Sequence, residues 1–400
     1  MLACPVAGLE AGFSAAMAGL GPFGAAPVLG IGVSGGPHSL ALAVLARGWA
    51  AARGGRVIAL VADHGLREDS AAEANGVVRR LCSMGIEARL LSLGLSPGPG
   101  LHERARAARL AALAEGCEAA GAPWLLLGHH RADQAETVAF RALRGSGEAG
   151  LAGMAAARPA GGVLVLRPLL GVGPGGIEEF LSGRGLVPVR DPSNGDPRFA
   201  RARLRAVLGA PDGPGVAALA EAGAGFAARR ERMRRLVAAR LAEAARFEPE
   251  GWARLDRGAL GMDAVAEAAL STLVRAVGGG GHPPGRAAVA AMLARGGGSL
   301  GGAVWRGAVL CREPARCAPP VPALPGIVWD GRWRVVAAPE GAVVGALGEG
   351  AGRGRMPALV AAGLAAVRDT AGRLLAAPGL PDGCHEAVKV EFRPITGPVA

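Results

Sequence analysis

Val33-Ser34-Gly35-Gly36-Pro37-His38-Ser39 is the stretch that decides the predicted fold. An apolar run, residues 28–33, leads into it and an Ala- and Leu-rich segment, residues 40–52, follows, which is the pattern of a strand, a tight turn and a helix start. Adjacent glycines can take positive φ and let backbone N–H groups approach a ligand, and the helix dipole favours negative charge there. The stretch therefore predicts a pyrophosphate or triphosphate site, although taken alone it also fits an ordinary turn between a strand and a helix.

The turn is not a Walker A loop. That motif requires a lysine directly after its second glycine, to reach the phosphates. The only lysine of this chain is Lys389, far from the turn, so no lysine caps a phosphate there.

Strand-like and helix-like segments alternate beyond the turn. The expected strands are residues 28–33, 56–62, 87–93, 124–127 and 163–166, and the expected helices are residues 40–52, 70–84, 102–120 and 132–143. This alternation predicts an α/β fold, a parallel sheet with helices on both faces, whose ligands bind beyond the carboxyl ends of the strands. The strand tips then bring together three sets of polar residues: Ser34 to Ser39, Asp63 with His64, and Gly128 to His130 with Asp133.

The remainder of the chain follows a different pattern. We expect an N-terminal extension over residues 1–26, an α/β domain over 27–210, a helical region over 211–298, and a small irregular α+β region over 299–400. The helices expected there span residues 196–208, 216–247, 256–277 and 285–293, and the β-like pieces span residues 303–311, 326–336 and 387–392.

Positive charge is concentrated in one part of the sequence. The chain has 44 basic and 33 acidic residues, a formal net charge of +11. Residues 196–246 contain eleven arginines and five acidic residues. Such a block can bind a phosphate backbone and steer a polyanion toward a site, or it can be the solvated face of a helix.

Composition also argues against several other classes of protein. Beyond the Ala- and Gly-rich N-terminus, no apolar stretch of about 18 residues is free of glycine, proline and charge, so we expect no membrane association. Residues 1–27 contain no basic residue, unlike a secretory signal, and the expected location is the cytoplasm. The six cysteines form no Cys-x-x-Cys pair, which favours buried or incidental thiols over a disulfide framework or a metal site.

An ordered series of motifs resembles the bacterial tRNA(Ile)-lysidine synthetases, a family of PP-loop ATP-pyrophosphatases. After the turn at 34–39 come Asp-His-Gly-Leu-Arg at 63–67, Ser-Ala-Ala-Glu-Ala at 70–74, Ala-Arg-Ala-Ala-Arg at 105–109, Leu-Leu-Leu-Gly-His-His-Arg-Ala-Asp-Gln-Ala-Glu-Thr at 125–137, Arg-Gly-Ser-Gly at 144–147, Gly-Leu-Ala-Gly-Met at 150–154, Arg-Pro-Leu-Leu at 167–170 and Asp-Pro-Ser-Asn at 191–194. The likeness covers residues 28–208, about half of the chain.

The resemblance implies an adenine nucleotide alpha-hydrolase-like fold and a ligase reaction in two steps. It also implies that residues 27–210 are the PP-loop catalytic domain, that residues 211–298 bind the tRNA or substrate, and that residues 299–400 can contribute to tRNA binding. ATP, with Mg²⁺, adenylates the wobble cytidine of a tRNA(Ile) that has a CAU anticodon, and pyrophosphate leaves. The ε-amino group of L-lysine then displaces AMP to give lysidine, which changes codon pairing from AUG to AUA. The sequence does not fix the oligomeric state, and a homodimer is compatible with it.

The resemblance also implies roles for individual residues. The ATP-binding set is Ser34, Gly35, Gly36, Pro37, His38, Ser39, Asp63, Arg106 and Arg109, with Asp63 as the Mg²⁺ ligand. His129, Asp133 and Glu136 are the catalytic set, because two carboxylates three residues apart share a helix face and can receive the lysine ammonium, with His129 as acid or base. Arg201, Arg203 and Arg205 are expected to contact the adenylate or the tRNA.

Each of these residues also has a structural interpretation. Asp133 and Glu136 would suit a helix N-terminus through the dipole alone, and a single histidine at a strand end, such as His129, is often structural. His64 and His130 are expected to pack or to form hydrogen bonds. Arg106 and Arg109 can instead form exposed ion pairs with Glu103 or Glu115.

His38 departs from the family motif, which has aspartate at that position. Mg²⁺ prefers carboxylate oxygen to imidazole nitrogen. We expect activity to persist because Asp63, His129, Asp133 and Glu136 remain. The alternatives are a catalytically impaired tRNA-binding homologue and another tRNA-modifying ATP-pyrophosphatase.

Overall fold

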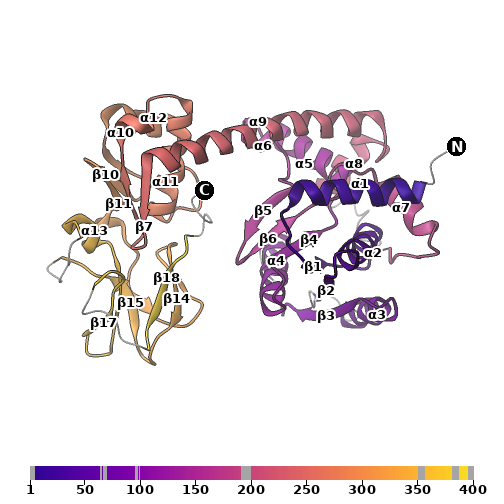
Figure 1. Ribbon diagram of the computed structural model, residues 1–400, viewed down its shortest axis with the longest axis horizontal. Helices are drawn as coiled ribbons and strands as arrows, with labels where there is room; N and C mark the ends of the chain where they lie inside the picture. The colour runs from indigo at the N-terminus through magenta and orange to yellow at the C-terminus, as the bar shows by residue number, and fades with distance from the viewer. Residues whose placement is uncertain are drawn as a thin grey trace. The chain divides into compact units, whose positions relative to one another are not determined.

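The computed structural model describes residues 5–63, 65, 70–94, 98, 100–190, 200–349, 356–380 and 387–394. The chain forms two compact units, Met1–Arg230 and Glu231–Ala400 (Figure 1). Each unit has its own hydrophobic core.

A six-stranded sheet in the order β3-β2-β1-β4-β6-β5 forms the centre of the first unit. Its strands are β1 (Val28–Gly32), β2 (Arg56–Asp63), β3 (Glu87–Ser92), β4 (Trp124–Leu127), β5 (Ala157–Ala160) and β6 (Val163–Leu166). The first four strands and β6 pair in parallel, as the sequence predicts. The strand order changes direction between β1 and β4, and ligands of open α/β sheets bind at such a switch point.

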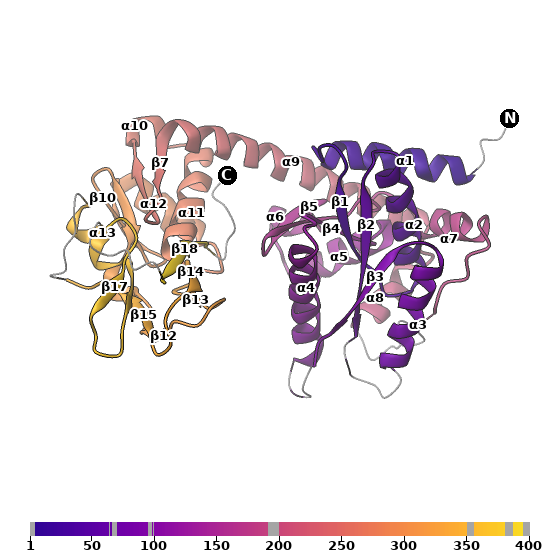
Figure 2. The ribbon, with the colours of Figure 1, turned by 60° about the horizontal axis from the view of Figure 1, so that its bottom comes forward.

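Helices cover both faces of this sheet (Figure 2). They are α1 (Pro5–Leu20), α2 (Pro37–Ala51), α3 (Ser70–Ser83), α4 (Leu101–Ala119), α5 (Arg131–Leu143), α6 (Glu148–Leu151), α7 (Pro174–Ser182) and α8 (Ala200–Leu208). Side chains of α1, α2, α3 and α7 share one hydrophobic core with one face of the sheet. On the opposite face α4 packs through Leu113 and Cys117 against Ile58 and Leu125.

Two elements of this unit, α1 and β5, were not among the expected helices and strands. The segment expected to be an extension forms α1, and Leu9, Phe13 and Met17 bury one face of that helix in the core because they recur every four residues. The edge strand β5 is antiparallel to β6, and its mostly exposed Ala-Arg-Pro-Ala sequence lacks the apolar run typical of a buried strand.

The second unit contains three small sheets. Helix α9 (Pro214–Ala244) begins in the first unit and ends in the second. The strands are β7 (Ala245–Glu248), β8 (Trp252–Leu255), β9 (Gly298–Leu300), β10 (Ala303–Arg306), β11 (Val309–Arg312), β12 (Val321–Pro322), β13 (Val328–Trp329), β14 (Trp333–Ala337), β15 (Val343–Ala346), β16 (Ala365–Arg368), β17 (Leu374–Ala376) and β18 (Lys389–Phe392). Their orders are β7-β8-β11-β10-β9, β12-β15-β16-β17 and β13-β14-β18.

Four α-helices and one 3-10 turn complete the described part of the second unit. They are α10 (Arg257–Leu260), α11 (Ala264–Gly278), α12 (Arg286–Arg295), the 3-10 turn η2 (Pro314–Arg316) and α13 (Ala358–Ala362). Residues 211–298, expected to be helical, also contain β7 and β8. The expected helix 216–247 ends at Ala244 because Phe247 pairs with Ala253 in an antiparallel hairpin.

A buried ionic network joins several loops of the second unit. The Asp330 carboxylate accepts hydrogen bonds from Arg312 Nη2 at 2.6 Å, from Arg332 Nη2 at 2.7 Å and from the Ala318 amide at 3.0 Å. Arg312 also donates to the Gly278 carbonyl at 2.6 Å. All three charged side chains are at least nine-tenths buried, so this network holds two cations and one anion away from water.

Within the described parts of both units, no helix combines the length and apolarity needed to cross a membrane.

Candidate active site

The glycine turn after β1 has the conformation that its sequence predicts. Gly35 has φ of +80°, and a Cβ atom there would lie 2.6 Å from Val77 Cγ2, so only glycine fits without strain. Ser39 closes the turn: its Oγ accepts from the Ser34 amide at 3.1 Å and donates to the Gly36 carbonyl at 3.0 Å. Pro37 begins α2 at a position where a missing N–H costs nothing. The turn therefore presents the N-terminus of α2 at the switch point of the sheet.

The end of β4 touches this turn through backbone atoms. A Cβ atom on Gly128 would lie 2.9 Å from the His38 carbonyl oxygen and 3.1 Å from the Ser39 nitrogen. Backbone atoms cannot rotate away as a side chain can. Gly128 is therefore required for the contact between β4 and the nucleotide turn.

Replacing Gly128 by alanine is expected to push the turn away from β4. We expect the free energy of unfolding to fall by about 1–3 kcal/mol, the usual cost of overpacking, and ATP affinity to fall with it. Thermal unfolding and calorimetric ATP titration measure the two effects. Gly176→Ala is the matched control, because a Cβ atom there meets nothing within 4 Å on helix α7. If Gly128→Ala and Gly176→Ala have the same stability and the same ATP affinity, the close contact between β4 and the turn does not hold the turn in place.

Helix α5 starts with a reciprocal cap. The His130 Nδ1 atom accepts from the Ala132 amide at 3.2 Å, and the Asp133 carboxylate accepts from the His130 amide at 3.1 Å. The same carboxylate lies 3.4 Å from His130 Nε2. His130 is thus a hydrogen-bonding residue, and its cap fixes the direction in which Asp133 projects. His129, at the residue before the cap, is half-buried.

His38 joins the nucleotide turn to helix α5. Its ring centroid lies 3.9 Å from that of His130, with the rings inclined by 61°. Burial and the neighbouring His130 lower the pKa of His38 to about 4, against the opposing effect of Asp133 and Glu178. Burial likewise lowers the pKa of His130 to about 4. Both imidazoles are therefore neutral at pH 7, and at position 38 the family motif has a carboxylate instead.

The histidine pair predicts a loss of stability in acid. Both folded pKa values lie below the unfolded value of 6.5, so the unfolded chain binds more protons and stability falls as pH drops from 6.5 to 4. We expect each histidine to contribute up to about 3 kcal/mol of this loss, because one pKa unit corresponds to about 1.4 kcal/mol. Denaturant unfolding at several pH values measures it against His38→Asn, which cannot titrate. If both proteins show the same slope between pH 4 and 6.5, the histidine pair is not the cause.

Glu136 lies on the buried side of α5 and is paired with Arg205 of helix α8. Arg205 Nε donates to Oε1 at 2.6 Å and Nη2 donates to Oε2 at 3.2 Å. The Glu136 side chain is only 3% exposed, whereas that of Arg205 is 44% exposed. Hydrogen bonding to Glu136 raises the pKa of Arg205. The ion pair therefore holds the Arg205 guanidinium of α8 beside α5 and leaves it partly exposed to solvent.

Asp63 ends β2, the strand next to β1. Its Oδ1 atom accepts from the Gly65 amide at 2.9 Å, which holds the carboxylate at the carboxyl end of the strand. No group of three or more His, Cys, Asp and Glu residues, within the described part of the chain, is arranged to hold a metal. One carboxylate with substrate phosphates and water still suits Mg²⁺, which usually keeps several waters. Asp63 fits that requirement, and the imidazole of His38 does not.

The remaining predicted arginines lie on α4 and α8. Arg109 is half-buried on α4, and Arg106 is exposed one turn before it. In the described residues Arg109 has no carboxylate partner, so the alternative of an ion pair with Glu103 or Glu115 is not seen for it. Arg203 is exposed on α8, and the side chain of Arg201 lies outside the described residues.

Several supporting contacts were not predicted. Gln134 of α5 exchanges hydrogen bonds with the backbone of Met154, at 3.1 Å and 2.8 Å. Arg141 donates to the carbonyls of Gly150 and Gly153. The motif at 150–154 was part of the family resemblance, but a motif alone does not say which helix holds it. These contacts fix α5 against the loop that precedes β5.

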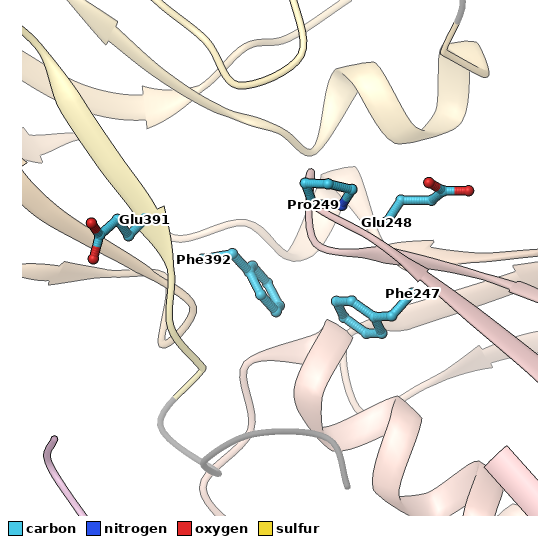
Figure 3. A pocket seen from close by; sticks show the side chains of 5 residues that line it. All are labelled: Phe247, Glu248, Pro249, Glu391 and Phe392. Atoms are coloured by element: carbon cyan, nitrogen blue, oxygen red, sulfur yellow. The ribbon is translucent and has the colours of Figure 1, made fainter. Parts of the chain in front are cut away.

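The second unit has a separate surface hollow. Its lining residues are Phe247, Glu248, Pro249, Glu391 and Phe392, and the two phenyl rings face one another with centroids 5.4 Å apart (Figure 3). Both glutamates form ion pairs, Glu248 with Arg254 and Glu391 with Lys389. The hollow contains none of the predicted site residues.

Residues 18–210 match the model of the PP-loop domain family. The tRNA(Ile)-lysidine synthase of Bradyrhizobium sp. is 45% identical over 190 residues, which are 47% of this chain and 53% of that protein. The enzyme of the same name from Methylobacterium nodulans is 40% identical over 67% of this chain and 80% of that protein. The one from Ruegeria pomeroyi is 35% identical over 76% of this chain and 75% of that protein. The chain spans about half the length of several such relatives and three quarters or more of others.

Proposed function

Because this chain belongs to the tRNA(Ile)-lysidine synthase family, we propose that it attaches L-lysine to the wobble cytidine of a tRNA(Ile) with a CAU anticodon, at the expense of ATP. One observation carries the proposal beyond membership of the family. The His38 and His130 rings, 3.9 Å apart, bring the nucleotide turn and the start of α5 into one site. ATP and an acceptor can therefore meet there.

The first step adenylates the base. The cytosine 2-oxygen attacks the α-phosphorus of ATP, the bond to the β-phosphate oxygen breaks, and pyrophosphate leaves. Ser34, Gly36 and Ser39 hold the pyrophosphate end at the N-terminus of α2, where backbone N–H groups and the dipole favour anions. Positioning and charge neutralisation supply the catalysis, because pyrophosphate is already a good leaving group.

The second step uses the residues of α5. The ε-amino group of lysine attacks C2 of the adenylated base, AMP leaves, and the amine loses its proton. Asp133 receives the ammonium and His129 takes part in the proton transfer. Glu136 holds the Arg205 guanidinium at 2.6 Å, which keeps a cation beside the adenylate phosphate. Glu136 thus acts through Arg205 in this proposal, in addition to the ammonium binding suggested by its spacing from Asp133.

Mg²⁺ would be held by Asp63 with phosphate oxygens and water, and when bound it neutralises phosphate charge. Arg203 and four arginines of α9, Arg229, Arg232, Arg234 and Arg235, lie on exposed helix surface and would contact the tRNA backbone. We place the reaction in the cytoplasm. The site residues named here all come from one chain, so the proposal does not require a homodimer.

A single assay tests the proposal. Purified protein, ATP, Mg²⁺, labelled lysine and the CAU-anticodon tRNA(Ile) should give lysidine, with pyrophosphate released in equal amount. Methionine tRNA with a CAU anticodon measures specificity. Absence of product, together with recovery of product by His38→Asp, would show that the histidine has inactivated the chain and that the tRNA-binding alternative is correct. A labelled product from another tRNA would instead identify a different ATP-pyrophosphatase.

A further inference from the structure

Residues 186–190, which follow α7 in the chain, lie against the nucleotide turn. The Val189 amide donates to the Gly35 carbonyl at 3.0 Å. A Cβ atom on Gly35 would lie 3.4 Å from Val189 Cγ2, and one on Gly36 would lie 4.0 Å from the Val189 carbonyl oxygen. Val189 therefore covers both glycines of the turn on one side, and we call residues 186–190 the strap.

The strap begins at a fixed point. The Leu186 amide donates to the Leu181 carbonyl of α7 at 3.0 Å, and the Leu186 side chain packs against the core of the first unit. Ile177, Phe180 and Leu181 bury one side of α7 in the same core. Leu186 therefore attaches the strap to a helix that is itself held in place.

Apolar burial does not hold the rest of the strap against the turn. Val187 is 76% exposed and Val189 is 47% exposed. Residues 186–190 belong to neither a helix nor a strand, so no ladder of backbone hydrogen bonds supports them. Segments with few buried apolar contacts open at a low cost in free energy, and the moving covers of binding sites are segments of this kind.

Two arginine side chains fasten the strap to neighbouring helices. Arg190 Nη2 donates to Glu178 Oε2 of α7 at 2.8 Å, and we call this ion pair the latch. Arg80 of α3 donates from Nη1 to the Val187 carbonyl. The Arg190 and Glu178 side chains are 70% and 36% exposed, and an exposed ion pair contributes little stability. The latch can therefore form and break readily.

The latch lies close to the phosphate site. Burial lowers the pKa of His38, and the Glu178 carboxylate is one of the charges that oppose this effect. Arg190 directly follows Val189, whose amide is bonded to Gly35. Breaking the latch therefore releases the end of the strap that lies against the glycine turn, and it leaves the attachment at Leu186 intact.

We propose that the strap is a moving cover of the nucleotide turn, and that the latch sets how often it opens for ATP to enter and pyrophosphate to leave. The inference rests on the proposed function, which places the pyrophosphate end of ATP at this turn. A cover that only opens and closes changes the rates of binding and release by the same factor, so the Kd does not change. A residue that binds the nucleotide changes the Kd.

The test measures nucleotide exchange in the full chain, by stopped-flow mixing with Mg²⁺ and a fluorescent N-methylanthraniloyl derivative of ATP. Arg190→Gln and Glu178→Gln both remove the latch, but they change the local charge in opposite directions. We expect both variants to bind and release the nucleotide about two- to fivefold faster, the range that loss of an exposed ion pair allows. Their Kd values should equal that of the wild type.

Three further variants complete the experiment. Arg80→Met removes the other side-chain contact of the strap and should accelerate exchange in the same way. Exchanging the charges, by Arg190→Glu together with Glu178→Arg, rebuilds the latch and should return both rates toward the wild type. Arg184→Gln is the matched control, because it removes an arginine and its 2.5 Å ion pair with Glu10 from the turn after α7, outside the strap.

Three results would decide against the cover. The first is that Arg190→Gln and Glu178→Gln leave both rates unchanged. The second is that Arg184→Gln accelerates exchange as much as they do. The third is that these two variants change the Kd in opposite directions, because their charges would then act on the nucleotide directly. A wild type that binds the nucleotide and shows the expected rate changes, but forms no lysidine, would overturn the proposed function and not the cover.

Discussion

Replacing Asp133 by asparagine is expected to reduce lysidine formation by a factor of about 10²–10⁴, the usual contribution of a positioned acid or base. Asparagine keeps the oxygen that accepts from the His130 amide at 3.1 Å, so the cap of α5 should survive. The carboxylate charge that would attract the lysine ammonium is lost. The expected result is therefore a slow but folded enzyme.

Single-turnover kinetics separate the two steps of the reaction. We expect adenylation, measured by pyrophosphate release, to change less than the transfer of lysine. Asp212→Asn is the control, because Asp212 also serves the start of α5 through its 2.9 Å ion pair with Arg131 but belongs to no predicted set. Asp133 has no role in lysine transfer if both variants retain wild-type rates, or if both lose activity equally with a lower thermal midpoint.

Replacing Asp330 by asparagine is expected to cost the second unit about 3–5 kcal/mol of stability, the usual cost of leaving a buried charge without its partner. The Asp330 side chain is 3% exposed between Arg312 and Arg332, which would remain as two buried cations. Asparagine tolerates the φ of +54° at this position, so backbone strain does not contribute.

Chemical denaturation followed by tryptophan fluorescence measures this loss, because Trp329 and Trp333 flank the network and are buried. Glu267→Gln is the control: its partner Arg286 has an 82% exposed side chain, and exposed pairs contribute about 0–1 kcal/mol. A loss no larger than that of the control would mean that water or another group compensates the arginines. ATP affinity, a property assigned to the first unit, should be unaffected by Asp330→Asn.

The sequence predicted the parallel sheet well because its inner strands, β2, β1, β4 and β6, are mostly buried. Runs such as residues 124–127 and 163–166 have matching bounds in the structure. Strand β7 lies where a helix was expected, for a physical reason. Residues 245–247 continue the composition of α9, and only their pairing with Ala253 to Leu255 makes them a strand.

The motifs of the candidate site could be predicted from the sequence, but the residues with which its side chains pair could not. Strand order alone places the turn after β1 beside Gly128, since β1 and β4 are paired neighbours at the switch point. The ion pair between Glu136 and Arg205 joins residues 69 positions apart, and no periodicity links α5 to α8. The burial of Arg167 likewise depends on packing, which its neighbours in the sequence do not reveal.

The glycine turn between β1 and α2 links nucleotide supply to the lifetime of the protein. A nucleotide held at that turn binds the native chain and not the unfolded one. ATP at a hundred times its Kd would add about 2.7 kcal/mol to the free energy of unfolding. A cell depleted of ATP would thus hold more of this protein in the state that proteases recognise.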